Sequence, residues 1–426
     1  MLALMVVLLS AFGTPSARAA DKIYLTDGTV VEGVIKQDLD GYLWVVTKVG
    51  GVETEVIYKP AQIDKVVRDT DGADTPKPAA TAARPAETQA TPKARSGNVV
   101  RAAVLSLGDQ VHHKDMVGTY MTAERLRRAI PLLEEELGTD GTGILVLRIS
   151  SGGGMLLEIQ KLSDVIEYEL KPRFRVVAWI ESAISAAAMT SHAIEEIYFT
   201  TAGHYGACTG WYGQLTAVKG RDLEDVLYMM EKISARGKKD PKIMRAMQIN
   251  GAPLSCSIDE YGNVTWYQTE DGGRYLVSRG DKILTFNSQN ALKYKFSKGT
   301  ADTVDELARA MGVPEVEWVG TEVEGIPYPV SKAEEYMRGY RDQVAEDESR
   351  TREYQIRYQS AIALAQSTPL ADRGKFVNKA RQALKLIERM VKNNPNFGLL
   401  IFNRPTYELF QQWVREQEEF LRSLMR

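Results

Sequence analysis

Residues 143–154 read GILVLRISSGGG, and residues 175–189 read RVVAWIESAISAAAM. Each stretch begins with a short apolar run of the kind that forms a buried strand. The first run ends in three glycines, and the second ends in a series of small residues. Buried strands that alternate with helices are typical of a parallel sheet covered on both faces. The two stretches therefore predict an α/β domain with small residues at the ends of its strands.

Strand-like and helix-like segments alternate around these two stretches, from residue 98 to about residue 325. Strands are expected at 99–107, 143–150, 175–180 and 196–199, and helices at 122–137, 155–170 and 222–235. Residues 255–286 interrupt the alternation and instead predict a β-meander, because glycine-containing turns separate short strand-like runs. We therefore expect one α/β domain over 98–325.

Three segments of different composition precede this domain. Residues 1–19 contain a short apolar run followed by Ala17-Arg18-Ala19, which predicts a signal peptide and export, with a buried N-terminal helix as the alternative. Residues 20–68 alternate in the strand period between glycine turns, which predicts a small barrel of the SH3-like or Sm-like kind. Residues 69–97 are rich in proline, alanine and threonine and predict a disordered linker.

The C-terminal segment, residues 326–426, is highly charged and predicts helices that break near residues 368, 393–398 and 404. Leu384, Ile387 and Val391 share one apolar face of such a helix. We expect a helical extension that packs on the core. Partner binding or oligomerisation through the apolar face is the alternative.

Composition excludes several classes of function. The 426 residues include 53 basic and 56 acidic side chains, so the net charge is −3 and no nucleic acid partner is expected. No apolar run reaches the roughly 18 residues that span a bilayer, which excludes a polytopic membrane protein. Cys208 and Cys256 could form one bridge or remain buried thiols, and His112 and His113 fit a solvated loop. No metal or cofactor is expected.

The glycines and the small residues predict a site where two neighbouring strands end. Glycine at a strand-to-helix turn lets backbone N–H groups converge beside the positive end of a helix dipole, which makes Gly153 and Gly154 candidate oxyanion donors. Ser185 would lie within reach of these amides as a nucleophile. Close packing of the helix is the alternative explanation for the same small residues.

The order of four blocks resembles the ClpP/crotonase superfold, and specifically the exported or membrane-associated Ser-Lys peptidases of the signal peptide peptidase A and NfeD type. The blocks are residues 144–166, 176–199, 203–210 and 284–312. This resemblance covers roughly half of the chain and implies a parallel-sheet spiral domain. It also implies a serine endopeptidase that cleaves polypeptides, forms a homo-oligomer and needs no metal or nucleotide.

The resemblance implies roles for individual residues. Counting back from Glu195-Glu196-Ile197 places the family's serine on Ser185, whereas counting forward from Trp179-Ile180 places it on Ala186. The Ala-Ala-Ser triplet itself would match Ala187. We favour Ser185 because it has a hydroxyl group, with Gly153 and Gly154 as the oxyanion hole.

The base that the resemblance implies is a lysine. Residues 234–237, Ser-Ala-Arg-Gly, resemble the family's stretch after the lysine-bearing helix, so Lys219 before that helix and Lys232 on it are both candidates. A lysine can accept the serine's proton only as a neutral amine, which requires burial to lower its pKa. An ordinary solvated charge is the alternative for each.

Two other functions remain open. The uncertain alignment of the serine and the lysine is compatible with a catalytically inactive ClpP-like scaffold that acts in assembly or peptide binding. Acyl-coenzyme A chemistry, as in the crotonase branch, uses a similar oxyanion hole, but export removes the chain from that cofactor. We expect a periplasmic or extracellular protein, with membrane or envelope association as a further expectation.

Overall fold

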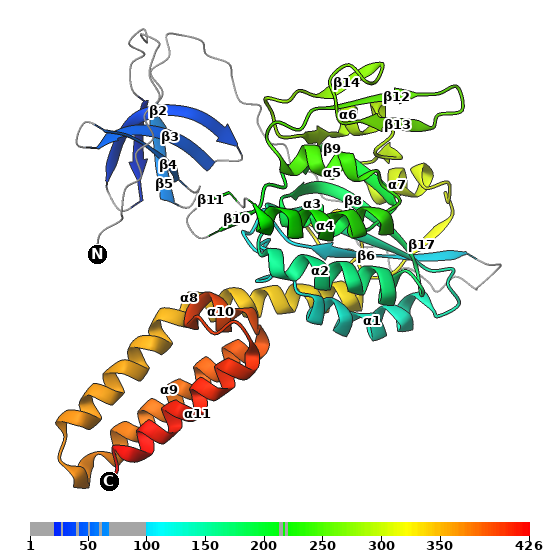
Figure 1. The fold of residues 1–426 in the computed structure, drawn as a ribbon. Helices are drawn as coiled ribbons and strands as arrows, with labels where there is room; N and C mark the ends of the chain where they lie inside the picture. Colours follow the sequence, from blue (N-terminus) through cyan, green and yellow to red (C-terminus); the bar gives the residue numbers. More distant parts are fainter. Residues whose placement is uncertain are drawn as a thin grey trace, which may run out of the picture. The chain divides into compact units, whose positions relative to one another are not determined.

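The computed structural model describes residues 21–26, 29–39, 42–49, 52–58, 62–67, 99–212, 216–217 and 220–426. The chain divides into two compact units, Met1–Lys93 and Ala94–Arg426, and each is considered by itself (Figure 1). The predicted signal peptide and the predicted linker both lie outside the described residues.

The first unit is an antiparallel sheet. Its strands are β1 (Asp21–Leu25), β2 (Val30–Leu39), β3 (Tyr42–Val49), β4 (Val52–Tyr58) and β5 (Ile63–Val67), in the order β4-β3-β2-β1-β5. Because β1 pairs with both β2 and β5, the first and last strands are neighbours. Ile23, Leu43 and Val45 form its buried core. The predicted small all-β unit is confirmed.

The second unit is built on a mostly parallel sheet in the order β15-β9-β8-β7-β6-β17. Its four central strands are β6 (Val100–Leu107), β7 (Ile144–Ser151), β8 (Arg175–Ile184) and β9 (Glu196–Gly206). These four are parallel, so their carboxyl ends lie at one edge of the sheet. The short β17 (Val316–Trp318) runs parallel to β6. All four strands predicted from the sequence are confirmed.

Apolar side chains cover both faces of this sheet. Leu147 and Ile180 belong to a large buried cluster with the helices α1 (Ala123–Leu137) and α2 (Leu156–Val165). On the other face, Val146 and Trp179 pack with residues of α7 (Val304–Ala310). The continuous apolar strands follow from this two-sided burial.

The structure corrects two helix boundaries. The helix predicted over 155–170 consists of α2 followed by a π-helical turn, Ile166–Leu170. The strand expected at 175–180 ends later, because β8 continues to Ile184, which pairs with Gly206 of β9, so the helix after it also starts later. Only α3 (Ala186–Ser191) is helical there.

A β-meander and short elements complete the α/β unit. β12 (Leu254–Ile258), β13 (Val264–Tyr267) and β14 (Tyr275–Ser278) form a separate sheet, which confirms the predicted meander. β15 (Thr285–Asn287) then joins the main sheet antiparallel to β9. The remaining short elements are β10 (Trp211–Tyr212), β11 (Thr216–Ala217), β16 (Gly299–Thr300), α4 (Arg221–Arg236), α5 (Pro241–Gln248) and α6 (Ser288–Lys293).

The C-terminal extension consists of α8 (Lys332–Ser367), α9 (Gly374–Asn393), α10 (Asn396–Phe402) and α11 (Tyr407–Ser423). The first part of α8 packs on β6 and α1, and its distal part packs against α9 (Figure 1). Leu384, Ile387 and Val391 are buried in this extension, as predicted. Among the described residues, no helix has the length and apolar character needed to cross a membrane.

Candidate active site

Ser185 lies at the junction between β8 and α3, where its backbone is strained. Its φ of 54° and ψ of −125° fall outside the regions that L-residues favour. Such a conformation costs on the order of 1–3 kcal/mol and persists only where neighbouring contacts enforce it. The Ser185 amide donates to the carbonyl oxygen of Gly206 at 2.9 Å, and its carbonyl accepts from the Met189 amide at 3.0 Å. A strained serine at a strand-to-helix turn is typical of catalytic nucleophiles.

The glycine turn after β7 lies directly against Ser185. A Cβ atom at Gly153 would be 2.6 Å from the Ser185 Cβ and 3.1 Å from its Oγ. The structure therefore brings together the serine and the glycines that the sequence placed at neighbouring strand ends. The Gly153 amide donates to Ser151 Oγ at 3.1 Å. The Gly154 amide donates to no protein atom among the described residues.

A loop before α1 holds the glycine turn, and the sequence pattern did not indicate this role for it. The Val117 amide donates to the carbonyl of Gly153 at 2.8 Å, and its carbonyl accepts from the Met155 amide at 3.0 Å. The carboxylate of Asp115 accepts from the Gly152 amide at 2.8 Å. Burial raises the pKa of Asp115 above its usual value. Irregular backbone of this kind has no hydrophobic period from which it could be predicted.

No family model matches the chain. The chain is similar to the membrane protein NfeD1b of Bacillus subtilis (strain 168), with 27% identity over 169 residues, 39% of this chain and 34% of the relative. The match therefore spans about a third of the length of this curated relative.

Two solved structures of the membrane-bound stomatin-specific protease 1510-N are also similar, at 13% identity. One is a lysine-to-alanine variant in complex with a substrate peptide, with a TM-score of 0.38 over 57% of this chain and 99% of that chain. The other is a serine-to-alanine variant, with a TM-score of 0.35 over 54% of this chain and 100% of that chain.

The parallel sheet and the glycine turn belong to the same compact unit of the chain. The α/β domain is a mostly parallel sheet with apolar cores on both of its faces. This confirms the fold expected from the sequence, an α/β unit preceded by a small all-β unit and followed by helices.

The structure describes one of the two candidate lysines of the α/β domain. Lys219 lies outside the described residues. Lys232 is exposed on α4, with its Nζ 4.2 Å from the centre of the Tyr228 ring on the same helix. Lys232 therefore makes a surface cation–π contact rather than a contact with Ser185. Among the described residues, none forms a hydrogen bond with Ser185 Oγ.

Lys239, which no sequence pattern indicated, is the one lysine among the described residues of the α/β domain whose pKa is strongly lowered. Burial lowers the pKa of Lys239 to about 7. Its Nζ donates to the carbonyl of Gly237 at 3.1 Å and also to the carbonyl of Ile194. Ile194 follows the C-terminal end of α3, whereas Ser185 precedes its N-terminal end. Lys239 therefore ties α4 to the segment after α3.

Two histidines and both cysteines of the α/β domain contact neighbouring residues away from Ser185 or are buried in its core. His192 is fully buried, its Nδ1 is 3.1 Å from the Tyr205 hydroxyl, and burial lowers its pKa well below the usual value. Cys208 and Cys256 are both buried with free thiols. His112 is exposed, and its Nδ1 lies 2.9 Å from an Asp109 carboxylate oxygen. The residues that the structure describes contain no cluster of histidine, cysteine or acidic side chains suited to a metal ion.

Proposed function

We propose that the ClpP-like domain is a serine endopeptidase that uses Ser185 as its nucleophile. The observation that supports this most strongly is the strained backbone of Ser185 in contact with the glycine turn. A serine hydroxyl beside a free backbone amide can attack a peptide carbonyl while the amide stabilises the resulting oxyanion. The Gly154 amide is available for this role, and the Gly153 amide would contribute if Ser151 released it.

The general base in this proposal is a lysine that takes the proton from Ser185 and passes it to the leaving amine. Water then attacks the acyl-enzyme with the same base assisting. Lys219 is the better candidate, because the ammonium of Lys232 lies at the surface over Tyr228. In this proposal the substrate is a polypeptide, and its hydrolysis requires no metal or nucleotide.

A catalytically inactive scaffold, acting in assembly or peptide binding, is the second candidate. Ser185 Oγ has no hydrogen-bond partner among the described residues, as expected if no base is in place. The strained backbone of Ser185 would then have no role in catalysis.

The cellular setting is part of the same proposal. A signal peptide over residues 1–19 would export the chain to the periplasm or the extracellular space. Membrane association is supported by the similarity to NfeD1b, which is a membrane protein. We further propose a linker over 69–97, a protease domain over 98–325, a helical extension over 326–426, and a homo-oligomer.

The decisive experiment is degradation of an unfolded protein by the purified chain without residues 1–19. Wild type is compared with Ser185→Ala, Lys219→Ala and Lys232→Ala, and intact mass is followed for an acyl adduct. Endopeptidase activity that disappears in Ser185→Ala and Lys219→Ala but persists in Lys232→Ala would support the proposal. Absence of cleavage by a folded wild-type chain would favour the scaffold.

A further inference from the structure

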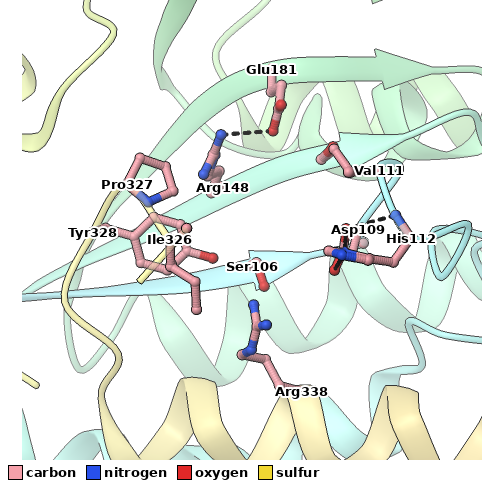
Figure 2. Close-up of a pocket in the computed structure, with 13 residues that line it drawn as sticks. Ser106, Asp109, Val111, His112, Arg148, Glu181, Ile326, Pro327, Tyr328 and Arg338 are labelled. Atoms are coloured by element: carbon pink, nitrogen blue, oxygen red, sulfur yellow. Dashed lines mark hydrogen bonds and ion pairs between the residues drawn. The ribbon is translucent and has the colours of Figure 1, made fainter. Parts of the chain in front are cut away.

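A polar pocket, separate from the candidate active site, lies on the face of the sheet opposite α1 and α2 (Figure 2). Its volume is about 290 Å³, and Ser185 does not line it. The side chains that matter here come from β6, β7, β8 and α8, and from the segments that follow β6 and precede α8. They are Ser106, Asp109, Arg148, Glu181, Tyr328 and Arg338.

Arg148 forms one wall of this pocket. Its guanidinium lies over the rings of Trp179 and Tyr328, at 5.2 Å and 5.3 Å from their centres, and pairs with Glu181 at 2.9 Å. Its Nε is buried and has no hydrogen-bond partner. The aromatic rings fix the plane of the guanidinium and leave one N–H donor unused.

Arg338 enters the pocket from α8. Figure 2 shows its side chain reaching toward Ser106. Arg338 is half-buried, yet it forms no hydrogen bond or ion pair with any residue that the structure describes. A partly buried guanidinium without a partner is unusual, because desolvating the charge costs free energy that pairing normally offsets.

The acceptors around the pocket are already engaged. Glu181 pairs with Arg148, and Asp109 pairs with His112 at 2.9 Å. Ser106 Oγ donates to Glu334 at 2.5 Å and accepts from Arg341 at 2.8 Å. The unused hydrogen-bonding capacity therefore lies mainly in the donors of Arg338 and Arg148, with the Ser150 hydroxyl, the second carboxylate oxygen of Glu181 and the Nε2 of His112 as the other free groups. A complementary ligand must supply acceptors.

We propose that this pocket binds a carboxylate group, with Arg338 as the principal contact and Arg148 as a second donor. A planar carboxylate matches the paired N–H groups of a guanidinium. Phosphate also matches that geometry, but the carboxylates of Asp109 and Glu181 face the same pocket and repel a dianion more than a monoanion. The carboxylate can come from the C terminus of a peptide or from a free small carboxylic acid.

The test measures binding by calorimetry to the full chain without residues 1–19, carrying Ser185→Ala so that no peptide is cleaved. The probes are trialanine, trialanine amide, N-acetylglycine and inorganic phosphate. Arg338→Gln removes the principal contact, and Arg352→Gln makes the same change at an exposed position of α8. Thermal unfolding shows whether each variant is folded.

We expect saturable binding of the carboxylates and none of the amide. Arg338→Gln should weaken binding by at least about tenfold, as for loss of a charge-assisted hydrogen bond, and Arg352→Gln should not change it. Glu181→Gln should strengthen binding, because it releases the Arg148 guanidinium. Tighter binding of trialanine than of N-acetylglycine would indicate that the pocket binds the C terminus of a peptide. Equal affinity for the two would indicate that it binds a free carboxylic acid.

Three results would overturn the assignment. Equal binding of trialanine and its amide would show that the carboxylate is not recognised. Unchanged affinity in a folded Arg338→Gln variant would show that Arg338 is not the principal contact of the ligand. Phosphate that binds more tightly than either carboxylate would contradict the preference for a monoanion.

Discussion

A methyl group at residue 153 has no room beside the proposed nucleophile. The Gly153→Ala change would place Cβ 2.6 Å from the Ser185 Cβ, on a backbone whose φ is 108°. We expect loss of peptidase activity and a loss of about 1–3 kcal/mol in the free energy of unfolding. Gly141→Ala is the control, since Gly141 also has a positive φ of 79° but nothing lies within 4 Å of its added Cβ. Denaturant unfolding with equal losses in both variants would argue against close contact at Ser185.

Lys239 should make stability depend on pH. Burial lowers its pKa in the folded state to about 7, below its ordinary value of 10.5, so between these values the unfolded chain binds more protons. Its contribution to the free energy of unfolding therefore rises with pH, by at most about 1.4 kcal/mol per unit between pH 7 and 10. Lys239→Met should flatten that rise in denaturant unfolding at several pH values. Lys238→Met, at an exposed position, should leave it in place.

At the residue scale, the sequence predicted contact between the serine and the glycines but not how the site is completed. The carboxyl ends of parallel strands lie at one edge of a sheet, so the sequence pattern alone predicted that Ser185 and Gly153 are close together. Asp115 could not, because an irregular loop carries it to the glycine turn. Lys239 was also missed, since burial of a charged side chain depends on tertiary packing and leaves no mark in its neighbours along the chain.

At the scale of elements, one buried ion pair anchors α8 on β6. Glu334 and Arg341 are fully buried 3.3 Å apart, and both bond to Ser106. Arg341→Met would leave the Glu334 carboxylate buried without its cation, so we expect a loss of about 3–5 kcal/mol in the free energy of unfolding. Arg350→Met, which breaks an exposed pair with Glu346, should change the free energy of unfolding far less. Similar losses for both changes, measured by denaturant unfolding, would contradict an anchoring role for the buried pair.

Most strands and helices were predictable, because the buried face of each produces a regular spacing of apolar residues in the sequence. The four parallel strands, the meander and the helix breaks near Pro369 and Pro405 all appear where the sequence indicated them. The end of β8 was not predictable. Residues 181–184 contain no glycine or proline that would exclude a helix, but pairing with β9 places them in the sheet. The pairing of β8 with β9 outweighs the local conformational preference of these residues, and it determines the position of Ser185.

At the scale of the whole α/β unit, the C-terminal extension supports the proposed active site through one loop. The Asn394 side-chain amide, fully buried after α9, donates to the carbonyls of Gly118 and Thr119 at 3.2 Å and 2.8 Å. That loop in turn holds Gly153 through Val117. The last helices therefore help to position a turn more than two hundred residues earlier in the chain.

Asn394→Ala tests this connection. Loss of both hydrogen bonds leaves two buried carbonyls with fewer partners, which should cost about 1–3 kcal/mol. Because the loop is then less firmly held, we expect faster hydrogen exchange at the Val117 amide, which donates to Gly153, and lower peptidase activity. Asn378→Ala, on the exposed face of α9, is the matched control. If exchange at Val117 were unchanged in a destabilised Asn394→Ala variant, the C-terminal helices would stabilise only themselves, and the glycine turn would depend on the loop alone.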